Sequence, residues 1–156
     1  MAYQVAALFE EPEDVEYDVV ELGEIAAELF DRSSSHVAAL AARVSTASVV
    51  VVVSPVVKGT YTALVKAFLE WFDRTSLQHV VVVPVMVGAA PHHALAVEAY
   101  LRPVLVELGG IAPTRGLYVM KDQLGELSPI VARWIAESSH VIRRVALKDR
   151  AQWASR

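Results

Sequence analysis

The chain has 156 residues, a formal net charge of −4 and a pI of about 5.7, with 54% hydrophobic and 21% charged residues. This length and composition predict one folded domain over residues 1–156 and exclude a disordered chain. The chain is acidic and has no cluster of Lys and Arg residues, which a nucleic-acid surface requires. The absence of cysteine excludes disulfides, cysteine nucleophiles and thiolate metal sites, and because it fits a reducing compartment we expect a cytoplasmic protein.

The apolar content predicts a buried sheet rather than a membrane span. The N-terminus, MAYQVAALFEEPEDVE, has no basic region, so we expect no signal peptide. The two longest apolar runs, 49–53 and 80–87, are too short to cross a bilayer. Mean hydropathy is +0.40, which we attribute to the sheet and to subunit interfaces of a homo- or hetero-oligomer.

The first part of the chain predicts small elements. The pattern favours a short helix over 3–10, a strand over 15–22 and a turn of helix over 25–30. The serines at 33–35 are suited to cap the next helix. The apolar residues of that helix recur at helical spacing, and they are Val37, Leu40, Ala41 and Val44.

Two unbroken apolar segments, 48–54 and 79–87, dominate the middle of the chain. Because neither has a polar face, both predict parallel strands covered by helices on both sides. Thr60 or Thr62 can begin the helix between them. Its apolar face comprises Leu64, Ala67, Phe68, Trp71 and Phe72.

After a loop of small residues at 88–91, the pattern predicts a helix over 93–108, in which Pro103 should produce a kink near Ala99. A short strand over 116–120 follows. A terminal helix begins at Pro129 and directs Ile130, Trp134, Val141, Ile142 and Val145 inward. Strands that alternate with helices in this way predict a three-layer α/β/α sandwich around a parallel sheet.

In such sheets a ligand lies outside the carboxyl ends of the strands. Two loops leave those ends here, at 54–61 and at 88–93. The first leads into a helix N-terminus, whose free N–H groups suit an anion or a polar ring edge. The second has small side chains that let a flat ligand approach the backbone. On spacing alone, both loops also fit ordinary strand-to-helix turns.

Two long segments resemble the NADPH-dependent FMN reductases. Residues 54–71, SPVVKGTYTALVKAFLEW, resemble the flavin-contact loop and following helix of that family, and residues 86–105, MVGAAPHHALAVEAYLRPVL, resemble its second loop and helix. The resemblance is greatest to the sulfonate-utilisation type, whose reductases supply reduced FMN to a partner monooxygenase. It implies a flavodoxin-like fold, with FMN and NADPH as cofactors.

The resemblance also implies which residues bind the flavin. They are Pro55, Val56, Val57, Lys58, Gly59, Thr60, Tyr61, Gly88, Ala89 and Ala90. Val57 stands where the family usually has Tyr, and Ala89 where it usually has a second Gly. Hydride transfer between two bound rings needs no acid–base pair, so no catalytic residue is assigned. We expect no metal at His92 and His93, because adjacent side chains diverge and no third ligand is near.

The expected opening of the family is missing from the sequence. Members begin with a hydrophobic strand and a loop resembling G-S-[PL]-R, which holds the FMN phosphate, and no G-S-x-R segment is present here. We therefore expect a sheet without its first strand and weaker phosphate binding. Two main hypotheses remain, an FMN reductase-like flavoprotein or a cofactor-less flavodoxin-like subunit that acts as a partner or scaffold. A third is a binder of another nucleotide or acidic small molecule.

Overall fold

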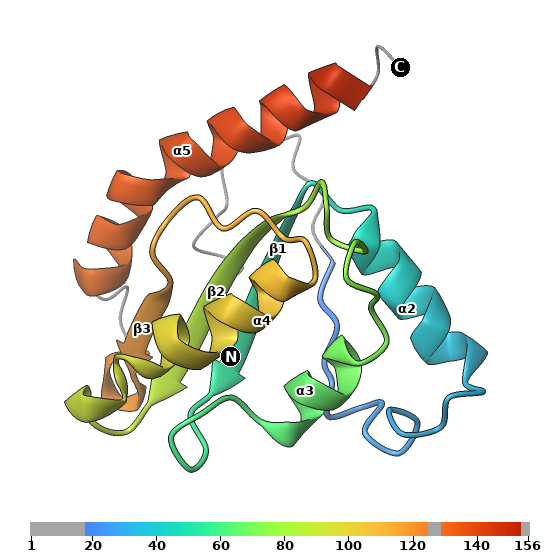
Figure 1. The fold of residues 1–156 in the computed structure, drawn as a ribbon. Coiled ribbons are helices and arrows are strands. Elements are labelled where there is room, and N and C mark those ends of the chain that lie inside the picture. The colour runs from blue at the N-terminus through green and yellow to red at the C-terminus, as the bar shows by residue number, and fades with distance from the viewer. Residues whose placement is uncertain (1–17, 125–128, 154–156) are drawn as a thin grey trace.

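The structure of the chain, a computed structural model, describes residues 18–124 and 129–153 (Figure 1). The helix expected at 3–10 lies outside the described residues, as do residues 15–17 of the expected first strand. The main elements, in chain order, are α2 (Ser35–Ser45), β1 (Val49–Pro55), α3 (Ala63–Leu69), β2 (Val81–Gly88), α4 (Arg102–Glu107), β3 (Leu117–Met120) and α5 (Pro129–Trp153).

The described strands form one parallel sheet in the order β1-β2-β3. β2 is central: it pairs with β1 from Val49↔Val81 to Pro55↔Val87 and with β3 from Val85↔Leu117 to Gly88↔Met120. All three arrows of Figure 1 point to the same end of the sheet. The parallel sheet and the strands expected at 48–54, 79–87 and 116–120 are thus confirmed, with bounds shifted by one or two residues.

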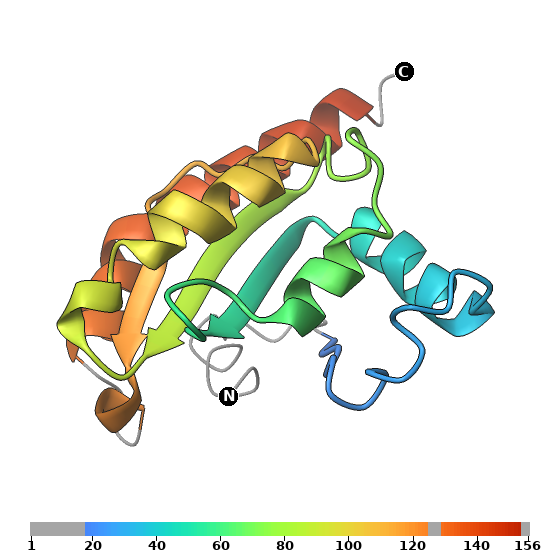
Figure 2. The ribbon, with the colours of Figure 1, turned by 60° about the horizontal axis from the view of Figure 1, so that its bottom comes forward.

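Helices cover both faces of the sheet (Figure 2). Side chains of a strand alternate between faces, so Val82 and Met86 of β2 pack in the core with α2, α3 and α4. Val81 and Val83 face the other way and pack in the core with α5. Every residue of β2 is buried, and each fully buried valine contributes about 1.5–3 kcal/mol. β2 therefore has no polar face because helices cover it on both sides.

Hydroxyl side chains begin the two helices that flank β1. The Ser34 Oγ accepts a hydrogen bond of 3.2 Å from the Val37 N–H at the start of α2. The Thr62 Oγ1 accepts one of 3.3 Å from the Val65 N–H at the start of α3. The expected cap at 33–35 is confirmed, and of the two threonines considered for α3, Thr62 is the cap.

The strand expected at 15–22 is wrong in its described part. Residues 18–21 have no regular structure, and hydrogen-bonded turns follow over 22–30, so the turn of helix expected over 25–30 is not present as a helix. Val20 and Leu22 nevertheless pack against the core. A strand needs a hydrogen-bonded neighbour, and within the described ranges β1 pairs with β2 alone. In the described part of this segment, the apolar residues therefore contribute packing rather than a ladder of hydrogen bonds.

The helix expected at 93–108 is broken into different helical types. A 3₁₀ turn (Pro91–His93) leads to a π-helical turn (Val97–Leu101) and then to α4. The Arg102 N–H donates to the Val97 carbonyl, and this bond between a residue and the fifth residue before it defines a π turn. Pro103 has no N–H to donate to the preceding turn, and around Ala99, where a kink was predicted, the helix departs from α geometry as this π turn.

Along α5 the buried residues are Val131, Ser138 and Ile142. Their spacing places them on one face of a helix with 3.6 residues per turn. Ile130 is one residue out of step with this row and 43% exposed, so its expected inward position was wrong.

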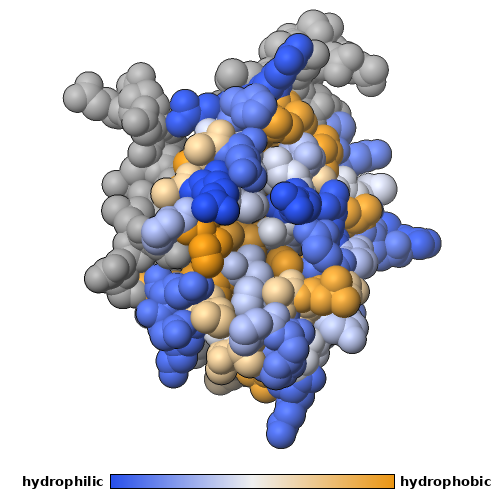
Figure 3. All heavy atoms as spheres, turned by 90° about the vertical axis from the view of Figure 1, so that its left-hand side faces the viewer, coloured by the Kyte–Doolittle hydropathy of each residue, from blue (hydrophilic) through white to orange (hydrophobic). Residues whose placement is uncertain are grey.

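No helix in the described part of the chain is both long and apolar enough to cross a bilayer. Seen from the β3 side, hydrophobic and hydrophilic areas alternate on the surface (Figure 3).

Candidate functional site

The two loops expected to bind a ligand lie side by side at the carboxyl edge of the sheet. Loop 55–61 follows β1 and loop 88–90 follows β2, its direct neighbour. The Val56 N–H donates a hydrogen bond of 2.7 Å to the Val87 carbonyl, which joins the bases of the two loops. The predicted residues, which come from two separate segments of the sequence, are therefore brought together at one edge.

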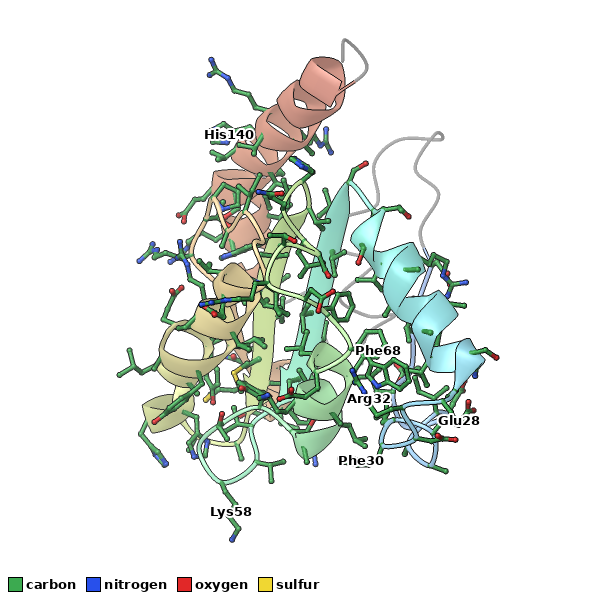
Figure 4. The ribbon with its side chains drawn as sticks, turned by 45° about the vertical axis from the view of Figure 1, so that its right-hand side comes forward. Glu28, Phe30, Arg32, Lys58, Phe68 and His140 are labelled. Carbon is green, nitrogen blue, oxygen red and sulfur yellow. The ribbon has the colours of Figure 1, made fainter. Side chains whose placement is uncertain are left out.

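Loop 55–61 contains a tight turn around Lys58 and Gly59. The Val57 N–H donates to the Thr60 carbonyl at 2.8 Å, and the Thr60 N–H returns a bond of 3.2 Å. Lys58 has φ 52° and Gly59 φ 85°, as both central residues of a type I′ turn require. A positive φ costs a non-glycine residue about 1–2 kcal/mol. The Lys58 side chain points away from the molecule at the tip of this turn (Figure 4).

One buried hydroxyl ties the two ends of loop 55–61. Ser54 is fully buried. Its Oγ accepts a hydrogen bond of 3.0 Å from the Thr62 N–H and donates one of 3.0 Å to the Pro55 carbonyl. Ser54 was not among the predicted site residues, although a single hydroxyl at the end of a valine run is a signal for such an anchor. The geometry of the loop therefore depends on this residue.

Backbone donors at the two loops are available to a ligand. Within the described part of the chain, the N–H groups of Lys58, Gly59, Ala89 and Ala90 have no backbone acceptor. Ala89 is exposed and Ala90 half-buried. Successive free N–H groups in turns are typical of sites for anions and for polar ring edges.

A hollow of about 410 Å³ lies beside loop 88–90, lined by Ala89, Lys121 and Asp122. Lys121 and Asp122 belong to a 3₁₀ turn (Lys121–Gln123) that follows β3. Of the predicted residues, Ala89 lines this hollow. Lys121 and Asp122 were not predicted, although they directly follow the strand expected at 116–120 and so belong to the same edge. The hollow thus lies between loop 88–90 and the turn that follows β3.

The two adjacent histidines after loop 88–90 contact one another. The rings of His92 and His93 lie 4.2 Å apart between centroids at an interplanar angle of 64°, so the expectation that they diverge was wrong. Among the described residues, no group of three or more His, Asp or Glu side chains is placed to hold a metal ion.

The sequence profile of NADPH-dependent FMN reductases matches residues 1–124 of this chain. The chain belongs to this family. The chain is 30% identical to an FMN reductase (NADPH) of Pseudomonas putida over 91 residues, and 32% identical to that of Escherichia coli K12 over 74 residues. These stretches cover 58% and 47% of this chain, and 46% and 39% of the two relatives, so the chain matches less than half the length of either.

Solved structures agree with the family in fold. An NADH:FMN oxidoreductase in its apo form superposes with a TM-score of 0.75 at 23% identity, over 94% of this chain and 79% of that chain. An oxidoreductase from Corynebacterium diphtheriae superposes with a TM-score of 0.66 at 21% identity, over 99% and 85% of the two chains. This member of the family therefore has a flavodoxin-like α/β fold.

The residues present fit the polar edge of a flavin ring. The N–H groups of Ala89 and Ala90, which have no backbone acceptor among the described residues, are donors of the kind that suits the acceptor atoms of a flavin ring. The two departures from the family pattern do not close the site, since Val57 is 49% exposed and Ala89 lines the hollow. Lys58 supplies a cation at the tip of the first loop.

Proposed function

We propose that this chain is an FMN reductase-like flavoprotein that transfers a hydride from NAD(P)H to FMN. One observation carries the proposal: in a member of this family, two neighbouring loops contain N–H groups without a backbone acceptor in the described structure, and an open hollow lies beside the second of these loops. Because the matched relatives are more than twice as long as the aligned stretches, the activity is inferred for this chain and not transferred from them.

FMN, when bound, would supply the redox chemistry by accepting a hydride from the nicotinamide. The chain would bind and orient it with Pro55–Tyr61 on one side and Gly88–Ala90 on the other. The N–H groups of Ala89 and Ala90 would donate to polar atoms of the ring, and Lys58 would attract negative charge. We assign no proton-transfer residue, because hydride transfer does not require one.

Release of the product follows from the openness of the site. Ala89, Lys121 and Asp122, which line the hollow, are all exposed. A flavin bound there can therefore leave after reduction, and we propose that a separate monooxygenase receives it. We also propose a homo-oligomer, since Leu95 is 71% and Val106 49% exposed, and apolar residues at the surface are stabilised by a subunit contact.

The experiment is a titration with FMN followed by flavin fluorescence, together with an assay of NADPH oxidation in the presence of FMN. Ala89→Glu introduces a bulky carboxylate into the hollow, and we expect it to weaken FMN binding by about tenfold or more. The control is Ala136→Glu, the same change at an exposed position of α5. This control should bind FMN as the unaltered protein does.

The outcomes separate the two hypotheses. Saturable quenching and turnover, both reduced in Ala89→Glu alone, support the reductase. A folded protein that leaves millimolar FMN unquenched and oxidises no NADPH overturns it and favours the cofactor-less partner or scaffold subunit. Light scattering of the same samples tests the oligomer, which we expect Leu95→Lys to weaken.

A further inference from the structure

Tyr118 of β3 contacts both ends of loop 88–90. Its hydroxyl donates a hydrogen bond of 2.6 Å to the Ala90 carbonyl. Its ring lies directly over Gly88, so closely that a Cβ added to Gly88 would collide with the Tyr118 hydroxyl. Gly88 has no positive φ, so the tyrosine, rather than the backbone, excludes a larger residue there. A single side chain therefore spans the loop that presents the Ala89 and Ala90 N–H groups.

β3 is itself held firmly where it begins. The Glu98 Oε1 accepts a hydrogen bond of 2.7 Å from the Gly116 N–H, just before β3. Arg102 donates to Glu98 Oε2 at 3.2 Å and to the Ala112 carbonyl at 2.9 Å. Both charged side chains are about one-third exposed. Because this network fixes the segment before β3, Tyr118 is presented to loop 88–90 from a rigid support.

We propose that Tyr118 is a positioning residue that holds loop 88–90 in its ligand-binding geometry, which rests on the proposed function of this loop. The Ala90 carbonyl also accepts a hydrogen bond of 3.1 Å from the His93 N–H. That bond comes from the loop's own continuation, whereas Tyr118 attaches the loop to the sheet. With its carbonyl held and its first residue packed under the ring, the loop keeps its N–H groups directed to the same place. Donors that are already oriented bind a ligand with less loss of conformational freedom.

The test is Tyr118→Phe, which keeps the ring over Gly88 and removes the hydroxyl. In the protein without ligand, ¹⁵N relaxation measures the order parameters of the Ala89 and Ala90 amides, which we expect to fall from the rigid value of about 0.85. FMN affinity should weaken by about 3- to 10-fold, the usual effect of one lost neutral hydrogen bond. The kcat at saturating FMN should change less than the affinity, because the residue does not touch the reacting atoms.

The control is Tyr100→Phe, the same chemical change at a residue that is 52% exposed. It should alter neither the order parameters nor the affinity. Unchanged order parameters in Tyr118→Phe overturn the proposal, and so does a looser loop that binds FMN as tightly as before. If the unaltered protein binds no FMN, the function proposed above fails, while the order parameters still decide whether Tyr118 holds the loop.

Discussion

Ser54→Ala should both loosen loop 55–61 and lower the stability of the protein. The substitution removes the acceptor of the Thr62 N–H and the donor to the Pro55 carbonyl, both at 3.0 Å, from a fully buried position. A buried N–H left without a partner costs about 1–3 kcal/mol. Taking about 2 kcal/mol, and a fall of about 2–4 °C per kcal/mol for a chain of this size, we expect the Tm to decrease by about 4–8 °C.

Thermal unfolding by circular dichroism measures this change, and the FMN titration measures its effect on the loop. The matched control is Ser45→Ala at the end of α2, where the hydroxyl donates at 3.0 Å to the Ala41 carbonyl. That carbonyl belongs to a helix and keeps a backbone donor, so the change should stay within about 0.5 kcal/mol. If the two variants lose the same stability, or if Ser54→Ala binds FMN as tightly as before, the anchoring role of Ser54 is refuted.

Three further changes test separate features. Lys58→Gly should raise the free energy of unfolding by about 0.5–1 kcal/mol in urea, since it relieves a φ of 52°, and should weaken FMN binding through the lost charge. The Ser34 hydroxyl, 2.7 Å from the Glu28 carboxylate, is the main cause that lowers the pKa of Glu28 below its usual 4.5, with His36 adding to it. This stabilisation is therefore present above pH 4.5 and is lost as the pH falls through the lowered pKa, so Glu28→Gln should flatten the dependence of Tm on pH in that acid range. Trp71→Phe removes the hydrogen bond of 2.9 Å from Nε1 to the Leu29 carbonyl and should cost about 1 kcal/mol in urea unfolding, with equal stability contradicting a role for that bond.

The strands and caps were predictable because their causes are local. Two valine-rich segments without a polar face require cover on both sides, whatever the rest of the chain does. Serine and threonine hydroxyls bond N–H groups two or three residues away, so Ser34 and Thr62 lie close to the helices they begin. Pro103 disturbs the turn before it because it lacks an N–H, and this also follows from the sequence.

Contacts between distant segments were not predictable from these patterns. The alternation at 15–22 would also have suited a strand, but strand formation depends on a neighbour that the local sequence does not specify. Likewise, Ile130 and Val131 are both apolar, and only the docking of α5 on the sheet decides that Val131 is buried and Ile130 exposed. Lys121 and Asp122 line the hollow because β3 ends beside β2.

By itself the sequence determined the parallel α/β architecture, the family and the two loops at the strand ends, because hydrophobic period, helix capping and motif spacing are properties of neighbouring residues. The tertiary structure decided how those loops are held. Ser54 closes the first loop, and Tyr118 reaches the second from another strand, 28 residues beyond the carbonyl that it binds. Hydrogen bonds of this kind depend on which strands pair and in which register, and that choice is made only when the whole sheet packs.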